Sequence, residues 1–242
     1  MENTTYIGLS RQSGLRQALD VVANNIANVN TPGYQAERIV FREFLVKPRN
    51  ESQISFVQDV GTARDLSDGP LQRTGNPLDV ALNGEGYFVL DTPLGERYTR
   101  HGRFQLNADG QIVTNAGYSV AGNGGPIQGN PNGGQITITK DGTVSDETGV
   151  LGQLRVVRFD DPQQLRKAAG SSFIAPDGVN PQNVNTPTIV QGMVEGSNVN
   201  AIGEMTRMIT LHRTHDSVAK FIQQEDKRQK DMIQTLGGTP GG

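Results

Sequence analysis

The histidines are the residues of this sequence whose type and spacing first suggest chemistry. His212 and His215 lie three positions apart, so on a helix they would share a face and could bind one metal ion together. Zinc usually takes three or four protein ligands, and these two imidazoles have no cysteine or pair of carboxylates near them. We therefore interpret both as ordinary residues of a helix surface or seam, and we predict no metal site.

Other residues that could support catalysis or ligand binding lack the spacing that such sites need. A catalytic triad would have to use His101, His212 or His215, and the sequence contains neither Gly-x-Ser-x-Gly nor His-Glu-x-x-His. The glycine-dense segment 122–129 lacks the ending of a phosphate-binding loop and does not open a helix. The pair Asp160-Asp161 lacks the ligand spacing of a calcium loop. We predict no cofactor and no enzymatic activity.

The composition excludes several classes of protein. Hydrophobic residues make up only 34% of the 242 positions and tryptophan is absent, so we expect a modest core with polar extensions. A formal net charge of −3 without a lysine or arginine run argues against a nucleic-acid partner. The absence of cysteine excludes disulfides, thiolate metal sites and cysteine nucleophiles.

Neither a membrane segment nor a classical signal peptide is expected. No stretch approaches the roughly 18–20 consecutive apolar residues that a membrane span needs. The N-terminal residues 1–6 show no basic region leading into an apolar one. We therefore expect a soluble protein that, if it leaves the cytoplasm, is exported without a cleaved signal.

The elements that would carry these residues begin with an N-terminal helix. Apolar residues recur there at spacings of four and three, which is typical of a helix with one apolar seam. This seam consists of Leu15, Leu19, Val22, Ile26 and Val29. The helix is expected to end at residues 30–33, because Pro32 disfavours the α region for Thr31 and Gly33 permits a turn.

The C-terminal segment shows the same spacing over a longer stretch. Its main seam consists of Met208, Leu211, His215, Val218, Ile222, Glu225, Gln229, Met232 and Leu236, and an adjacent stripe consists of Ile202, Met205 and Ile209. A helix over 198–236, capped by Ser197 or Asn198, would be about 55–60 Å long. We expect the two terminal helices to pair as a coiled coil that is weak alone, because polar residues interrupt its seam.

Between the helices the sequence predicts antiparallel strands. Residues 78–82 alternate between apolar and other side chains, and an apolar run follows at 87–90. Asp-Gly pairs at 109–110 and 141–142 separate apolar runs, and each predicts a hairpin with a type I′ turn, which needs positive φ. The predicted fold class is α+β, with N- and C-terminal α-helices paired as a coiled coil and a central, mainly antiparallel all-β domain.

The predicted organisation has four parts. Residues 1–33 form an N-terminal assembly helix, 34–75 an extended or mixed connector, 76–190 the central β domain, and 191–242 a C-terminal assembly helix. Long helices whose apolar stripes are incompletely covered suit a protein that completes its packing with neighbouring subunits in a polymer.

Three motifs resemble those of flagellar rod and hook proteins. The first is LDVVANNIANVNTPGY at 19–34, in which Pro32 stands where relatives often carry Asn. The second is PLDVALNGEGYFV at 77–89, followed by YTR at 98–100, GRF at 102–104, DG at 109–110 and GY at 117–118. The third is GSNVN at 196–200 with EM at 204–205 and MI at 208–209. The motifs follow one another in the order of that family.

The resemblance implies a structural subunit of the flagellar basal-body rod that packs helically and transmits torque, with its paired terminal helices forming the inner tube. The short length and the segments 122–127 and 194–199 are most similar to the proximal-rod type, and the distal-rod type is the alternative. The resemblance also implies contacts with copies of itself and with other axial proteins. It implies export through the flagellar type III apparatus into a rod that crosses the periplasm, without direct membrane insertion.

The asparagines at 24, 25, 28 and 30 leave two interpretations open, because Asn is a mediocre helix former. They could belong to a fraying, solvated helix end, or their amides could bind neighbouring helices in a packed tube. The resemblance favours assembly contacts. The predicted assembly residues are Leu15, Leu19, Val22, Asn24, Asn25, Ile26, Asn28, Val29, Thr31, Gly33, Tyr34, Ile202, Met205, Met208, Ile209, Leu211, Val218 and Ile222.

Two other functions are the competing hypotheses. A secreted adhesion or carbohydrate-binding β module would need exposed aromatic platforms, but the chain has five Tyr, eight Phe and no Trp, several of them in apparent core runs. An enzyme would need a pocket that contains perturbed titratable groups. A structural axial subunit needs neither feature.

Overall fold

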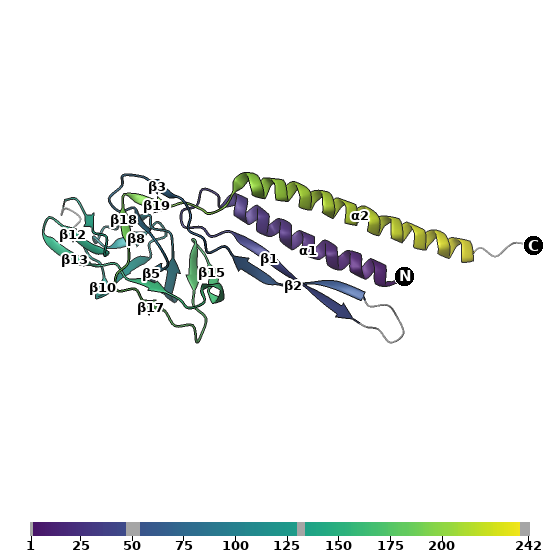
Figure 1. Ribbon diagram of the computed structural model, residues 1–242, viewed down its shortest axis with the longest axis horizontal. Helices are drawn as coiled ribbons and strands as arrows, with labels where there is room; N and C mark the ends of the chain where they lie inside the picture. The colour runs from purple at the N-terminus through teal and green to yellow at the C-terminus, as the bar shows by residue number, and fades with distance from the viewer. Residues whose placement is uncertain (1, 47–53, 130–133, 238–242) are drawn as a thin grey trace, which may run out of the picture. The chain divides into compact units, whose positions relative to one another are not determined.

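A computed structural model describes residues 2–46, 54–129 and 134–237 (Figure 1). The chain divides into two compact units. The first comprises Met1–Ala27, Glu37–Arg64 and Asn200–Gly242, and the second comprises Asn28–Ala36 and Asp65–Val199. Each unit is therefore assembled from segments that lie far apart in the sequence.

The first unit contains both long helices and a two-stranded hairpin. Helix α1 spans Glu2–Ala27 and α2 spans Ala201–Gly237, and the two lie side by side (Figure 1). Strands β1 (Glu37–Val46) and β2 (Ile54–Arg64) pair antiparallel and pack against α1. The region predicted as a connector thus supplies a second partner for α1. Within the described residues, neither helix combines the length and apolar run that crossing a membrane requires.

Both helix ends differ from the sequence prediction. Helix α1 ends at Ala27, and a turn follows in which Thr31 donates its backbone N–H and its hydroxyl to Asn28, at 3.0 and 3.1 Å. Helix α2 begins at Ala201, and its N-cap is Asn200, whose Oδ1 accepts from the Gly203 N–H at 3.0 Å. The prediction of Ser197 or Asn198 as the cap was wrong, because residues 193–195 form a strand and the chain reaches the helix later.

The second unit is built from short strands and one 3₁₀ turn. These are β3 (Leu71–Arg73), β4 (Val80–Leu82), β5 (Tyr87–Thr92), β6 (Gly95–Thr99), β7 (Phe104–Leu106), β8 (Ile112–Thr114), β9 (Ser119–Gly122), β10 (Gly125–Pro126), β11 (Thr137–Ile138), β12 (Thr143–Asp146), β13 (Gly149–Gln153), β14 (Val156–Arg158), η1 (Pro162–Gln164), β15 (Arg166–Ala168), β16 (Ser172–Ile174), β17 (Gln182–Asn183), β18 (Ile189–Gln191) and β19 (Met193–Glu195). All of the described strand pairs are antiparallel, which confirms a mainly antiparallel β region.

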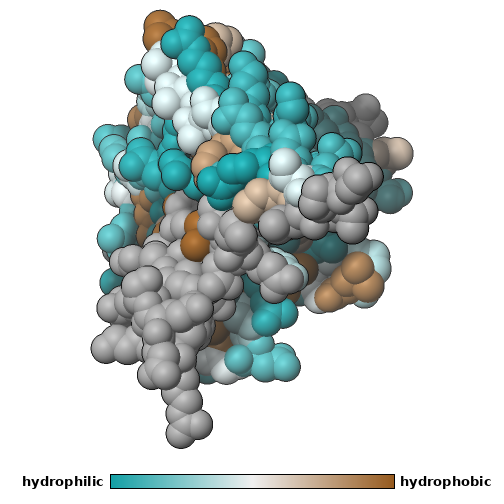
Figure 2. All heavy atoms as spheres, turned by 90° about the vertical axis from the view of Figure 1, so that its right-hand side faces the viewer, coloured by the Kyte–Doolittle hydropathy of each residue, from teal (hydrophilic) through white to brown (hydrophobic). Residues whose placement is uncertain are grey.

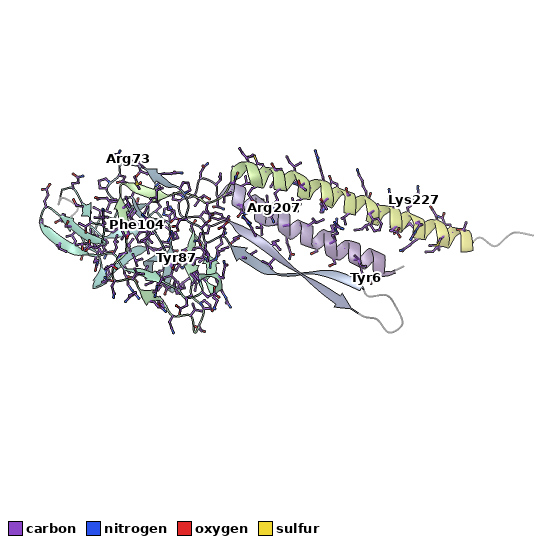
Figure 3. All side chains as sticks on the ribbon, viewed as in Figure 1. Tyr6, Arg73, Tyr87, Phe104, Arg207 and Lys227 are labelled. Carbon is purple, nitrogen blue, oxygen red and sulfur yellow. The ribbon has the colours of Figure 1, made fainter. Side chains whose placement is uncertain are left out.

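One large sheet organises this unit. Its main path among the described strands is β15-β16-β6-β5-β9-β8-β7, with β14 also paired to β5. Along β5, consecutive residues point to opposite faces, so Phe88 and Leu90 enter one hydrophobic cluster while Tyr87 and Val89 enter another. Tyr87 and Phe104, labelled in Figure 3, belong to these two different clusters. The apolar run at 87–90 is therefore a strand that is buried on both faces.

The two Asp-Gly pairs form hairpins, but not with the predicted turn type. Strands β7 and β8 pair across Asp109-Gly110, and β11 and β12 pair across Asp141-Gly142. Only the glycines have positive φ, at 81° and 85°, whereas type I′ turns need it at both central residues. In each loop the glycine N–H donates to the carbonyl three residues earlier, which is typical of a type I turn closed by a left-handed glycine.

Candidate functional site

The buried line of α1 consists mainly of small residues. Gly8, Gly14, Ala18 and Val22 are all buried, and a Cβ placed on Gly8 would lie 3.0 Å from Cγ1 of Ile222 in α2. The predicted seam residues Leu15, Leu19 and Ile26 are only half-buried, so they flank this line. These small side chains permit α1 and α2 to approach each other closely. They do not belong to the periodic pattern of large apolar residues, so that pattern does not reveal them.

Two stripes of α2 have different surroundings. The described part of the main seam is half-buried throughout; it consists of Met208, Leu211, His215, Val218, Ile222, Glu225, Gln229 and Met232. The adjacent stripe is exposed, with 79% of Ile202, 53% of Met205 and 54% of Ile209 accessible to solvent. Spacings of three and four keep these three side chains on one face of the helix. The first unit thus presents an apolar stripe that its own fold does not cover.

An apolar groove lies between α1 and α2. Its lining residues are Ile7, Gly8 and Arg11 from α1 and Thr214, Ser217, Val218 and Phe221 from α2, around about 410 Å³. Ile7 and Phe221 are 37% and 44% exposed. Viewed from the end of the helices, apolar patches interrupt a largely hydrophilic surface (Figure 2). The groove and the α2 stripe are two separate apolar surfaces on one unit.

His212 and His215 occupy different environments on α2. His212 is exposed, whereas His215 is half-buried with its Nε2 3.4 Å from Nε2 of Gln12 in α1. Within the described parts of the chain, no three His, Asp or Glu side chains cluster as metal ligands would. His215 therefore takes part in the contact between the two helices.

Asn25 is buried inside the first unit. It is 0% exposed, and its Nδ2 donates to the backbone oxygen of Glu37 at 2.8 Å and to Oε2 of Glu204 at 3.2 Å. Its Oδ1 accepts from the Glu37 N–H at 3.0 Å. One amide thus joins α1, β1 and α2, which satisfies groups that would otherwise be costly to bury. The described contacts of Asn25 therefore lie within the first unit, and one of them is with the neighbouring helix α2.

In the second unit, the buried side chain of Arg100 joins two parts of the second motif to Asp68 and to Glu195, which directly precedes the third motif. Nε of Arg100 donates to Glu195 at 2.8 Å, Nη1 donates to the carbonyls of Gly84 and Gly86 at 2.6 and 2.9 Å, and Nη2 pairs with Asp68 at 2.6 Å. The side chains of Arg100 and Glu195 are each only 3% exposed. Charged donors matched to this many acceptors form a strong junction.

The carboxylate of Glu195 also accepts a backbone hydrogen bond, and its pKa is shifted. Oε1 of Glu195 accepts from the Gly69 N–H at 3.1 Å. Burial raises the pKa of Glu195, while the guanidinium of Arg100 opposes that shift. Because the folded state then binds the proton more tightly than the unfolded chain, the contribution of Glu195 to stability falls as the pH rises through its folded pKa.

The end of the first motif is fixed to this junction. Gly33 donates its N–H to the backbone oxygen of Glu195 at 2.8 Å, and it has φ +66°. A Cβ on Gly33 would lie 2.5 Å from the backbone of Arg100 and His101, so only glycine fits there. Tyr34 is 4% exposed and carries the ammonium of Lys167 over its ring, 4.6 Å from the centroid.

Asn198 of the third motif links two other segments of the second unit, at Ala36 and at 65–67. Its Oδ1 accepts from the Ala36 N–H at 2.7 Å, and its Nδ2 donates to the carbonyls of Asp65 and Ser67, each at 2.9 Å. This side chain therefore bonds to backbone in place of capping α2. The first and third motifs meet directly, because the Asn198 N–H donates to the carbonyl of Tyr34 at 3.3 Å.

The predicted assembly residues fall into three groups by burial. Val22, Asn25, Gly33 and Tyr34 are buried; Leu15, Leu19, Ile26, Asn28, Val29, Thr31, Met208, Leu211, Val218 and Ile222 are half-buried; Asn24, Ile202, Met205 and Ile209 are exposed. Of these, Ile202, Met205 and Ile209 have more than half of their surface accessible to solvent. The pairing of Arg100 with Glu195 was not predicted, because the two residues lie 95 positions apart and no local pattern connects them.

Three family models match the chain. They are described as Flagella basal body rod protein over residues 6–35, Flagellar hook protein FlgE/F/G D1 domain over 81–146, and Flagellar basal body rod FlgEFG protein C-terminal over 190–235. These ranges overlap all three motifs.

Several curated relatives are similar over nearly their whole length. A flagellar basal-body rod protein FlgF from Caulobacter vibrioides is 40% identical over 98% of this chain and 99% of its own. The FlgF protein of Rhizobium meliloti is 34% identical over 99% and 100% of the two chains. The FlgG protein of Bacillus subtilis is 32% identical over 96% and 98%.

Replacing Arg100 by Met should leave Glu195 buried without its cation. We expect the free energy of unfolding to fall by about 3–5 kcal/mol at pH 7, and by less at pH 5, where protonation of Glu195 removes the unpaired charge. Urea unfolding at the two pH values measures both effects. The control Arg103→Met removes a guanidinium that is 47% exposed and should cost under about 1 kcal/mol. Equal losses for the two variants would refute the role of the junction.

Replacing Gly33 by Ala tests the close approach to Arg100. Gly75 is the matched control, because it also has positive φ, +76°, but no atom within 4 Å of an added Cβ. Gly75→Ala should lower the free energy of unfolding by about 1–2 kcal/mol, the cost of a left-handed conformation. Gly33→Ala should cost at least about 1–3 kcal/mol more, because its Cβ meets backbone. Similar unfolding midpoints for the Gly33→Ala and Gly75→Ala variants would show that the backbone of Arg100 does not crowd Gly33.

Proposed function

The chain belongs to the flagellar basal-body rod protein family, and on this basis we propose that it is a structural rod subunit of the FlgF kind. Its relatives are named as flagellar basal-body rod proteins and not as enzymes. The subunit would assemble with copies of itself and with other axial proteins of the proximal and distal rod. Its physical task would be to make lateral contacts that transmit torque.

The exposed stripe of α2 is the observation that carries this proposal. Ile202, Met205 and Ile209 are apolar, share one helix face, and are 53–79% exposed in the isolated chain. Burying an aliphatic side chain contributes about 1.5–3 kcal/mol, so covering this stripe on a neighbour would favour assembly. A protein that functions alone has no evident reason to keep such a stripe in water.

The half-buried seam of α2 supports a finer proposal for the helices. Met208, Leu211, Val218 and Ile222 follow the spacing of a coiled coil, and Ile222 approaches Gly8 of α1. We propose that the two helices act in the rod as a coiled-coil pair, completed by neighbours around a common axis. Export through the flagellar type III apparatus, without a cleaved signal, into a rod that crosses the periplasm is part of the same proposal.

The alternative within the family is a distal-rod subunit of the FlgG kind. The FlgG relative from Bacillus subtilis is 32% identical and also matches over nearly its whole length. The FlgF relatives are 33–40% identical and are matched over 99–100% of their own length, so the proximal-rod assignment is preferred. The family assignment replaces the adhesion-module hypothesis.

Replacing Met205 by Asp should separate assembly from folding. Because Met205 is more than half exposed, the isolated protein should keep its unfolding free energy to within about 0.5 kcal/mol. Its incorporation into rods in cells should fall about tenfold or more, since 1.4 kcal/mol of lost contact already gives a factor of ten. Quantitative blotting of purified basal bodies measures this fraction.

The matched control for this experiment is Gln223→Asp. Gln223 is exposed on the same helix, so this variant adds the same charge without removing an apolar side chain. It should incorporate normally. Ile222→Asp is less informative, because Ile222 also contacts α1 inside the unit. Normal incorporation of Met205→Asp would contradict the proposed interface.

A further inference from the structure

The α2 wall of the groove between the helices repeats the spacing of the exposed stripe on the same helix. Each set has the spacing i, i+3 and i+7, and the groove set lies twelve positions after the stripe set. The two sets are Ile202, Met205 and Ile209 in the stripe and Thr214, Ser217 and Phe221 in the groove. At ~1.5 Å per residue, equivalent positions of the two surfaces are about 18 Å apart along α2.

The stripe and the groove face different directions around α2. With 3.6 residues per turn, a shift of twelve positions rotates the helix face by about 120°. A neighbour that covers the stripe therefore leaves the groove of the same molecule open. Each molecule can use both surfaces only by meeting one neighbour through the stripe and another through the groove. Contacts between two unlike surfaces of identical molecules build rings or open helical polymers, and not two-fold dimers.

The groove can be covered by an apolar partner without breaking the hydrogen bonds of its α2 wall. The hydroxyl of Thr214 donates to the carbonyl of Thr210, and that of Ser217 donates to the carbonyl of Arg213, each at 2.9 Å. These donors stay paired when a partner excludes water, so covering them does not leave them unsatisfied. Arg11 also lines the groove but is exposed, so its guanidinium can remain in water.

The stripe has the pattern of a helix that docks in such a groove. Apolar side chains at i, i+3 and i+7 are the anchors by which amphipathic helices bind apolar grooves. Burying an aliphatic side chain removes on the order of 100 Å² from water, so the three side chains supply roughly 300 Å². A stable complex of two proteins buries about 800 Å² on each partner. The contact is therefore too small to hold a dimer in solution, and its partner must be kept close by other contacts, as copies in one polymer are.

We propose that the α2 stripe of each subunit docks in the α1–α2 groove of the next copy of the same chain. Copies in one helical polymer point the same way along its axis, so their α2 helices run parallel. A shift of about 18 Å between neighbours then brings Met205 of one copy beside Ser217 of the next. This inference rests on the proposed rod function and adds the surface that covers the stripe.

Cross-linking between two introduced cysteines tests this contact in assembled rods. The chain has no cysteine, so a Met205→Cys, Ser217→Cys double variant carries one reactive group on each surface. Both replaced side chains are exposed, so the thermal midpoint of the purified variant should stay within about 2 °C of the wild type. A short bismaleimide applied to intact basal bodies should link successive copies into a ladder of dimers and larger species.

The matched control pairs Met205→Cys with Gln223→Cys. Gln223 is exposed and lies eighteen positions after Met205, which is five full turns, so it shares the stripe face and points away from the groove. This control and each single variant should give at most a tenth of the cross-linked product. An equal yield from the control, or dimers without larger species from the Met205–Ser217 pair, would overturn the docking.

Filling the groove tests the same contact without cross-linking. Ser217→Leu places a bulky side chain where the neighbour's stripe would lie, so incorporation into rods should fall at least about tenfold, while Gln223→Leu should incorporate normally. Normal incorporation of Ser217→Leu would overturn the docking.

The results also separate this inference from the rod function. If the Met205–Ser217 pair gives no ladder while Met205→Asp fails to incorporate, a different axial protein covers the stripe; the docking then fails and the rod function stands. Normal incorporation of Met205→Asp would instead contradict the rod interface itself.

Discussion

The ion pair between Arg100 and Glu195 holds together parts of the second unit that the sequence separates widely. Both side chains are 3% exposed, so neither charge is stable there without the other. The backbone oxygen of Glu195 accepts a hydrogen bond from the Gly33 N–H, and its carboxylate accepts one from the Gly69 N–H. Four segments therefore depend on one buried contact for their register. Gly33 belongs to the first motif, Arg100 belongs to the second, and Glu195 directly precedes the third, so this one local structure lies where the three motifs approach one another in space.

The second constraint is that the first unit does not cover all of its own apolar surface. Helix α1 is packed against α2 and against the β1–β2 hairpin, and Asn25 bonds to both. The main seam of α2 is half-buried, whereas its second stripe at 202–209 is exposed to solvent. The first unit thus holds the apolar stripe of α2 in place on its surface but does not bury it, so the stripe is accessible to a neighbouring subunit. A structural subunit of a polymer needs this combination.

Local patterns predicted part of this structure, and long-range contacts account for the rest. The helical spacing of α2 and the presence of hairpins at the two Asp-Gly pairs were predicted correctly, because these signals are local in the sequence, but the predicted type I′ turns were wrong. The β1–β2 hairpin was missed, since its strands carry adjacent apolar pairs in place of strict alternation. The small residues Gly8, Gly14 and Ala18 escaped a search for large apolar side chains. Arg100 and Glu195 lie 95 positions apart, so no local rule could pair them.

The α2 stripe is accessible to solvent in the isolated subunit, and we propose that neighbouring subunits cover it in the rod. The chain contains no cysteine, so a single Met205→Cys variant gives one reactive position. Its rate of maleimide labelling can be measured in the purified protein and in intact basal bodies, with depolymerised basal bodies as the reference. We predict rapid labelling of the isolated protein and strong protection in the basal body. Equal labelling in both states would contradict the account.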